Sequence, residues 1–206
     1  MADIEELAAA EIRVLGALIE KEMTTPDYYP LSLKSLTAAC NQKSNRDPVV
    51  AFDEGLVEEV LAGLSRKQLV VKSGGGRVER YAHNLAAVLD LAEAEAAILC
   101  LFMLRGPQTA GELNSRSGRL HSFTSLDEVR ETLDTLAGME LVKKLPRRPG
   151  QKEARYCHLL AGEPEVEAET EAGPQKPFGL AAEVEELKER LAALEREFAA
   201  FKDQFE

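Results

Sequence analysis

An internal repeat constrains the fold of this 206-residue chain more than any other feature of its sequence. Seven positions within residues 53–72 recur 72 residues later with the same or a similar side chain. Such self-similarity indicates that one structural unit is built twice. The matched positions are Asp53, Val57, Leu61, Leu64, Leu69, Val70 and Lys72, and then Ser125, Val129, Leu133, Leu136, Leu141, Val142 and Lys144.

Three further matches surround this one and keep the same order along the chain. Their offsets of 75, 77 and 84 residues change only where loops are expected, and loops tolerate insertions. The matches link Arg80–Leu85 with Arg155–Leu160, Ser32–Leu36 with Thr109–Leu113, and Glu11–Leu18 with Glu95–Phe102.

Each copy is predicted to contain three helices. The first spans Ile12–Glu22 or Ala94–Arg105, where apolar residues recur at helical spacing. The second begins at an N-cap, Ser32 or Thr109, whose hydroxyl can accept a backbone hydrogen bond.

The third helix is predicted to begin at Asp53 in the first copy and at Ser125 in the second, where Ser125 and Glu128 suggest a capping box. Its stripe of Val and Leu is expected to face the core. A strand, a turn and a second strand containing Arg-Tyr-x-His follow, with the turns at residues 73–76 and 146–150.

Three helices closed by a β-hairpin are typical of the winged helix, a relative of the helix-turn-helix. The expected fold is therefore mainly α with small β-hairpins (α+β). It comprises two tandem winged-helix domains, residues 1–90 and 91–160, and a C-terminal coiled-coil helix. The alternative is an unrelated pair of small helical domains.

The C-terminal segment differs from the repeats. Residues 161–179 alternate Glu with Ala, Pro, Gly and Thr, which predicts a flexible acidic linker. Residues 180–206 carry a heptad seam, which predicts a coiled-coil helix and a parallel homodimer; the alternative is an amphipathic helix folded onto its own domains. The expected dimerisation residues are Leu180, Val184, Leu187, Leu191, Leu194, Phe198, Phe201 and Phe205.

The net charge of −11 does not exclude nucleic-acid binding, because the charge is unevenly distributed. Residues 1–90 contain 10 Lys/Arg and 14 Asp/Glu, residues 91–162 contain 10 and 9, and residues 163–206 contain 5 and 13. The N-terminus lacks the basic segment of a secretory signal, and the apolar runs are too short for a membrane span. The 3 Cys form no disulfide or metal pattern, so a cytoplasmic protein that contacts no membrane is expected.

A polar tract between the second and third helices of the first copy is one candidate site for nucleic acid. Its amide and basic side chains are the types that read base edges and neutralise phosphates. The alternative is a turn whose side chains cap helix ends. The candidate residues are Asn41, Gln42, Lys43, Asn45 and Arg46.

The two hairpins are a second candidate site, because a winged helix can contact the DNA backbone through its wing. The alternative is a solvated basic hairpin without a ligand. Against base reading, the third helices begin with carboxylates, which suit a helix N-terminus but repel phosphates. The candidate residues are Lys72, Arg77 and Arg80 in the first hairpin and Lys143, Lys144, Arg147, Arg148, Lys152 and Arg155 in the second.

Catalytic motifs are absent from the sequence. His83 and His158 occupy equivalent strand positions, as structural residues of a repeat would, and no base can be assigned to Cys40. We therefore expect no enzyme activity, no cofactor and no metal site.

The tracts Leu15–Leu33 and Asn41–Val49 resemble the YceH-type family of uncharacterised bacterial proteins, and the resemblance extends over roughly residues 8–162. It implies a tandem winged-helix fold in the bacterial cytosol and no established activity. The leading hypothesis is a DNA-associated, regulator-like homodimer that binds duplex DNA without catalysis. The alternative is a protein-interaction module similar to the paired winged helices that assist chromosome-condensing complexes.

Overall fold

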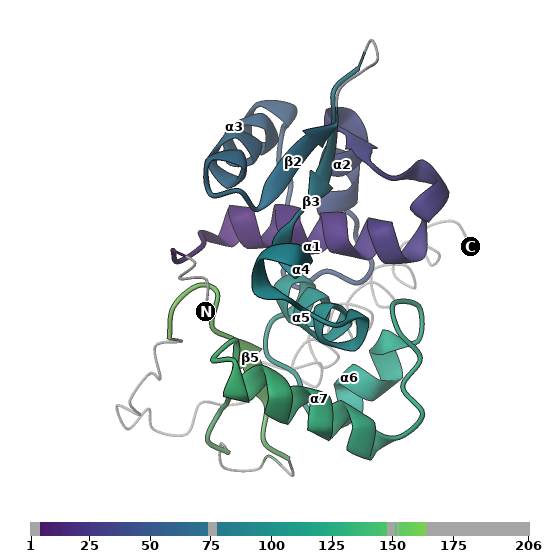
Figure 1. Ribbon diagram of the computed structural model, residues 1–206, viewed down its shortest axis with the longest axis vertical. Coiled ribbons are helices and arrows are strands. Elements are labelled where there is room, and N and C mark those ends of the chain that lie inside the picture. The colour runs from purple at the N-terminus through teal and green to yellow at the C-terminus, as the bar shows by residue number, and fades with distance from the viewer. Residues whose placement is uncertain (1–4, 74–77, 148–150, 152, 164–206) are drawn as a thin grey trace, which may run out of the picture. The chain divides into compact units, whose positions relative to one another are not determined.

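The computed structural model describes residues 5–73, 78–147, 151 and 153–163. They form a mainly helical structure with small antiparallel sheets, which confirms the predicted α+β class (Figure 1). The first half contains α1 (Ala9–Thr24), η1 (Pro26–Tyr28), β1 (Leu31–Ser32), α2 (Leu33–Cys40), α3 (Glu54–Arg66), β2 (Val70–Ser73) and β3 (Arg80–His83). After α4 (Leu85–Leu89), the second half contains α5 (Glu93–Arg105), α6 (Ala110–Ser117), α7 (Leu126–Gly138), β4 (Val142–Lys144) and β5 (Tyr156–His158).

The sheets repeat the same register in the two halves. The first has the strand order β1-β3-β2, and the second pairs β4 with β5. Val70 lies opposite His83, and its counterpart Val142 lies opposite His158. β1 also has a counterpart: Leu31 pairs with Tyr81, and an isolated bridge joins Gln108 to Tyr156 at the equivalent positions. The sequence repeat is therefore a structural repeat down to the pairing of single residues.

The predicted N-caps are confirmed. Ser32, Asp53, Thr109 and Ser125 each accept a hydrogen bond from the backbone N–H three residues later. The capping box expected at Ser125 is wrong in one respect. The carboxylate of Glu128 accepts from the backbone N–H and the hydroxyl of Thr124, both at 2.7 Å, and not from Ser125. Glu128 therefore fixes the backbone at Thr124, one residue before the N-cap, instead of at the N-cap itself.

The third helices bury the predicted stripes. Val57, Leu61 and Leu64 of α3 belong to one core cluster, and the equivalent residues of α7 belong to another. The first cluster also takes in side chains from the second half, namely Cys100, Met103, Leu104 and Leu160. The two cores are consequently in direct contact.

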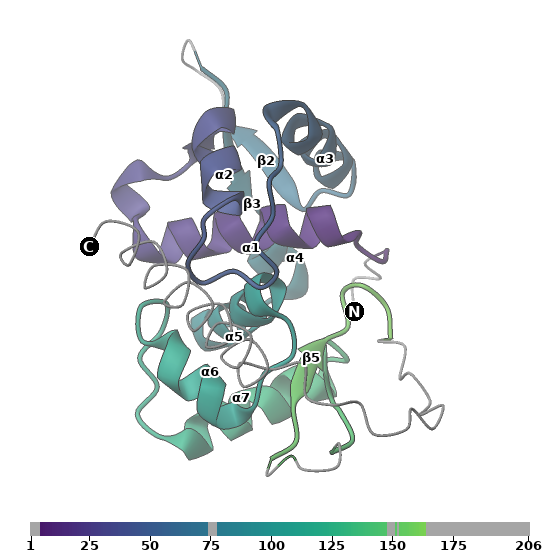
Figure 2. The same cartoon turned by 180° about the vertical axis from the view of Figure 1, so that it is seen from behind.

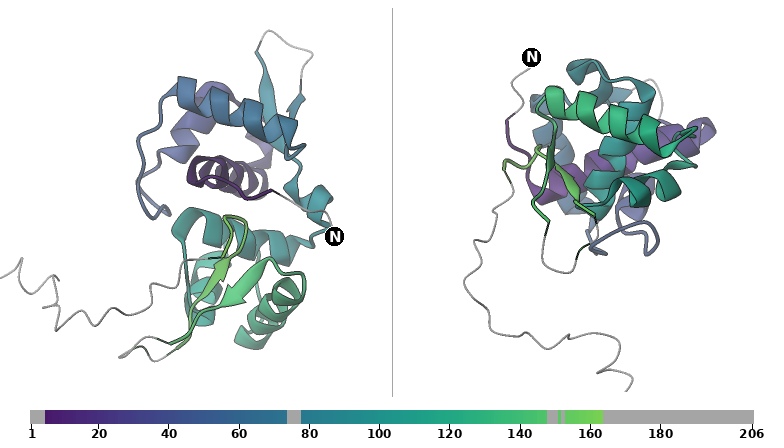
Figure 3. Two further views of the ribbon diagram at one scale, coloured as in Figure 1. Left: turned by 90° about the vertical axis from the view of Figure 1, so that its left-hand side faces the viewer. Right: turned by 90° about the horizontal axis from the view of Figure 1, so that it is seen from below.

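The contact between the halves is a close crossing of α1 and α5, with α1 lying between the rest of the first half and the helices of the second (Figures 1 and 3). A Cβ built on Gly16 would lie 2.9 Å from Cβ of Met103 and 3.0 Å from Cδ2 of Leu104. Cys100 donates its thiol hydrogen to the carbonyl of Gly16 at 3.4 Å. Because Gly16 and Cys100 are equivalent positions of the repeat, the crossing resembles the isologous contact of a two-fold dimer.

All described residues belong to one compact unit. The predicted coiled coil lies outside the described residues, as does the predicted linker after residue 163. The tips of the two predicted turns, residues 74–77 and 148–150, lie outside them as well. Among the helices that the structure describes, none combines the length and apolarity needed to cross a bilayer.

Gly16→Ala should lower the free energy of unfolding by about 1–3 kcal/mol, because the added methyl group meets α5 at a distance that forces the helices apart. Chemical denaturation of the purified full-length protein measures this change. Gly138→Ala is the matched control, because a Cβ there meets nothing within 4 Å at an exposed helical position. It should stabilise the protein by about 0.5–1 kcal/mol. Equal effects at both positions would contradict the close crossing.

Candidate functional site

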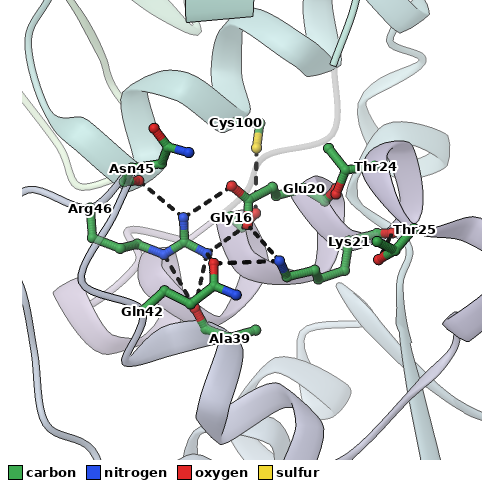
Figure 4. A network of polar contacts seen from close by, with 10 residues as sticks. All are labelled: Gly16, Glu20, Lys21, Thr24, Thr25, Ala39, Gln42, Asn45, Arg46 and Cys100. Atoms are coloured by element: carbon green, nitrogen blue, oxygen red, sulfur yellow. Dashed lines mark hydrogen bonds and ion pairs between the residues drawn. The ribbon is translucent and has the colours of Figure 1, made fainter. Parts of the chain in front are cut away.

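The polar tract of the first half, residues 41–53, links α2 to α3 and is held in place by Arg46. The Arg46 side chain is 0% exposed. Its guanidinium donates to both carboxylate oxygens of Glu20, at 2.6 and 3.1 Å, and to the carbonyl of Ala39 at 2.9 and 3.2 Å (Figure 4). These bonds use the groups with which Arg46 would contact a nucleic acid, so its burial argues for a structural role.

The Glu20 carboxylate is stabilised in its charged form. Burial alone would raise the pKa of Glu20, but the hydrogen bonds and the charge of Arg46, assisted by Lys21, outweigh it and hold that pKa below its usual value. A buried ion pair with several additional hydrogen bonds can persist in the low-dielectric interior, whereas either partner alone could not.

Two amide residues of the tract also have structural partners. The side chain of Asn41 donates to the carbonyl of Phe52 at 2.7 Å and accepts from its N–H at 2.8 Å. The amide thus makes the two hydrogen bonds with Phe52 that a residue of a neighbouring antiparallel strand would make. Gln42 accepts hydrogen bonds from Lys21 and Arg46. Lys43 and Asn45 are the exposed members of the predicted set.

The same loop reaches the second half of the chain. It descends past α1 to α5, where the N–H of Asp47 donates to the carbonyl of Leu104 at 2.9 Å (Figure 2). Buried Arg13 donates to the carbonyl of Pro48 at 2.6 Å, and burial followed by repulsion from Arg46 lowers the pKa of Arg13. The loop therefore fastens the two halves together beside the helix crossing.

The described basic residues of the first hairpin, Lys72 and Arg80, both have partners within the protein. Lys72 lies 3.1 Å from the Glu79 carboxylate and 5.7 Å from the centre of the Tyr81 ring. Arg80 donates to the carbonyl of Pro30 at 2.8 Å. Arg77 lies outside the described residues.

Two basic residues of the second hairpin, Arg155 and Lys143, also have partners. Arg155 donates to the carbonyl of Pro107 at 2.6 Å, which is the equivalent of the bond between Arg80 and Pro30, and also pairs with Glu112 at 3.2 Å. Lys143 lies 2.8 Å from Glu163.

The second hairpin also carries basic side chains that have no carboxylate partner among the described residues. Lys144 lies over the Tyr156 ring at 5.7 Å, and Arg147 is exposed; neither forms an ion pair within the described part of the chain. Arg148 and Lys152 lie outside that part.

The third helices expose carboxylates, as their sequences predict. Glu54, Glu58 and Glu59 are exposed on α3, and Asp127 and Glu131 on α7. Such faces repel phosphates and disfavour the reading of bases by these helices.

Glu20, the partner of Arg46, is a residue that the sequence patterns do not single out. It lies 26 residues from Arg46 in the chain, and no spacing rule links two such distant charges. The available signal was local: Glu20 directly follows the apolar run Val14–Ile19, and a carboxylate buried with such a run requires a cationic partner.

The three cysteine thiols are buried, and none is activated as a nucleophile by its surroundings. Burial raises the pKa of the Cys40 thiol to about 12, and the pKa values of Cys100 and Cys157 are shifted upward as well. Burial lowers the pKa of His158 to about 4. No cluster of His, Cys, Asp or Glu within the described ranges could hold a metal ion.

These features define a mainly helical protein made of two repeated units, each with one hairpin, and with an anchored loop between α2 and α3 of the first unit. Residues 7–151 match the family model described as "Protein of unknown function, DUF480". The chain is 52% identical over 192 residues to a UPF0502 protein of Geobacter sulfurreducens, covering 92% of this chain and 87% of that protein. It is 50% identical over 202 residues to a UPF0502 protein of Solibacter usitatus, covering 98% and 95%. The chain belongs to this DUF480/UPF0502 family, consistent with the YceH-type resemblance.

Arg46→Met should lower the free energy of unfolding by about 3–5 kcal/mol, because it leaves the Glu20 carboxylate buried without its principal partner. Urea denaturation measures the loss. The double variant Glu20→Gln/Arg46→Met should regain part of it, since the buried charge is then removed from both sides. Arg66→Met, at an exposed position of α3, is the control and should change stability by no more than about 0.5 kcal/mol. If Arg46→Met changed the free energy of unfolding as little as this control does, Arg46 would not be the residue that anchors the loop.

Proposed function

We propose that this protein is a non-catalytic, DNA-associated homodimer of the cytoplasm, built from two tandem winged-helix domains and joined through its C-terminal segment. The first half runs helix, short strand, helix, helix and hairpin, and the short strand joins the hairpin sheet. The second half has the same order of helices and hairpin, with the single bridge Gln108–Tyr156 in place of the short strand. This order supports the winged-helix assignment, because a wing is a hairpin that closes a three-helix core.

The observation that carries DNA binding is the unpaired charge of the second hairpin. Lys144 and Arg147 present cations to solvent with no carboxylate partner in the described residues. The segment around them, residues 91–162, contains 10 Lys/Arg against 9 Asp/Glu, whereas the rest of the chain is acidic. Because the protein as a whole has a net charge of −11, phosphates should be attracted mainly to this hairpin, where positive charge is exposed.

The proposed mode of binding is contact with the phosphate backbone. Exposed carboxylates on α3 and α7 disfavour insertion of either helix into the major groove. A wing that carries lysine and arginine can lie along the backbone without reading bases. Weak sequence preference and a strong dependence on salt are therefore expected.

A protein partner is the second candidate, and the first half supplies the observation that favours it. Leu56 on α3 is 38% exposed among carboxylates, and Val71 and Val78 of the first hairpin are 46% and 61% exposed. Apolar side chains bordered by acidic ones suit a basic, amphipathic segment of another protein.

Purified full-length protein should retard duplex DNA in a gel at low salt, and Lys144→Glu/Arg147→Glu should abolish the retardation. For each phosphate that a variant no longer neutralises, the slope of log K against log salt should become shallower by about 0.9. The control Lys34→Glu/Arg66→Glu reverses two exposed charges in the first half and should retain binding.

Failure to retard DNA at any salt concentration would reject the leading proposal. Capture from cells of one defined protein, unchanged by nuclease, would then support the second candidate. Capture that nuclease abolishes would reject the second candidate.

The proposed dimer depends on the heptad positions of residues 180–206. Leu191→Lys/Leu194→Lys places charge in the seam and should give a monomer in light scattering, as should truncation after Gly179. Ala192→Lys/Ala193→Lys adds the same charge outside the seam and should leave a dimer. A monomeric wild-type chain, or a dimer that survives both seam changes, would contradict assembly through this segment.

A further inference from the structure

A pocket outside both predicted sites lies where the two halves meet. Arg105, at the end of α5, and Arg116 and Arg119, in and just after α6, line it from the second half. Thr24 and Asn45 contribute from the first half. Three arginines lining one pocket were not anticipated from the sequence, because the packing of α5 against α6 brings them to the same place.

The positive charge of this pocket is not balanced by the residues around it. Arg105 and Arg119 form no ion pair within the described ranges, and Arg116 lies 3.5 Å from Glu112, which is also bound by Arg155. Glu20 lines the pocket, but its carboxylate is already occupied by Arg46 and Lys21. Arg105 and Arg119 therefore have no ion-pair partner in the described ranges, although the carboxylates of Asp47 and Glu112 act on Arg105 from further away.

The surroundings of Arg105 reflect this imbalance. Burial, and next the repulsion from Arg116, lower the pKa of Arg105, although Asp47 and Glu112 act in the opposite direction. An arginine under such repulsion gains more from an added anion than an isolated surface arginine does, because the anion relieves the repulsion as well as pairing with the charge.

We propose that this pocket binds the phosphate group of a small phosphorylated molecule. A phosphate monoester carries about −1.5 to −2 charge at neutral pH, so it would be attracted to Arg105 and Arg119, which have no ion-pair partner among the described residues. Planar guanidinium groups bind phosphate oxygens with pairs of N–H donors, and three of them can surround the group.

The rest of the lining suits the organic part of such a ligand. Leu101, Leu104 and Leu120 also line the pocket, and of these Leu120 is the partly exposed side chain that a ligand could contact. Asn45 has a left-handed backbone, with φ of 58°, and its amide is turned away from the Arg46 guanidinium (Figure 4). That amide supplies a donor and an acceptor beside the arginines.

The ligand would touch both halves, since Asn45 belongs to the anchored loop and the arginines belong to α5 and α6. Binding would therefore strengthen the junction that the loop already fastens. This assignment does not depend on the proposed DNA contact, because it uses none of the hairpin residues.

Isothermal titration calorimetry of the full-length protein tests the assignment, with inorganic phosphate and phenyl phosphate as probes at constant ionic strength. Both should bind saturably, and phenyl phosphate somewhat more tightly because its ring can contact the partly exposed Leu120. Arg105→Gln and Arg119→Gln should each weaken binding at least about tenfold, since each removes a charge-assisted contact. Arg66→Gln removes an exposed arginine elsewhere and should leave the affinity unchanged.

Saturable binding that only the pocket variants weaken would establish the site. Absence of saturable binding by either probe would overturn it, as would equal weakening by Arg66→Gln. Binding of duplex DNA that requires Arg105 and Arg119, without binding of the small phosphates, would also overturn it. Lys144→Glu/Arg147→Glu should bind phenyl phosphate normally, so the pocket and the proposed DNA contact can fail independently.

Discussion

The crossing of α1 and α5 at Gly16 is the contact on which the arrangement of this protein depends. The two helices approach so closely that a methyl group at Gly16 would meet the Cβ of Met103. Repeated units with separate cores can move relative to each other when little apolar surface joins them. Here side chains of α5 enter the first core, so the two halves are held as one unit.

The anchored loop and the arginine pocket both follow from that junction. Arg46 fixes the loop partly through Glu20, which lies one helical turn after Gly16 on α1. The loop in turn reaches Leu104 of α5 and brings Asn45 to the pocket. The polar tract that the sequence marks as a candidate for base reading thus joins the halves, and one of its exposed residues, Asn45, lines the proposed anion site.

Much of the fold follows from local signals in the sequence. Helix N-caps such as Ser32 and Thr109, and the positions of the two hairpins, depend on residues close together in the chain, so spacing predicts them. The roles of the charged residues depend on distant partners. Arg80 and Arg155 bind carbonyl groups 50 and 48 residues away, and Arg46 binds a carboxylate 26 residues away, so composition alone suggests free cations at all three positions. The exposed carboxylates of α3 needed no partner and were predicted correctly.

Differential scanning calorimetry of the full-length protein at fixed concentration tests the central claim, that the α1–α5 crossing makes the two halves a single cooperative unit. A single transition is expected for the repeats, with equal calorimetric and van't Hoff enthalpies. Two separate transitions, or a calorimetric enthalpy about twice the van't Hoff value, would show that the halves unfold independently and would contradict the account.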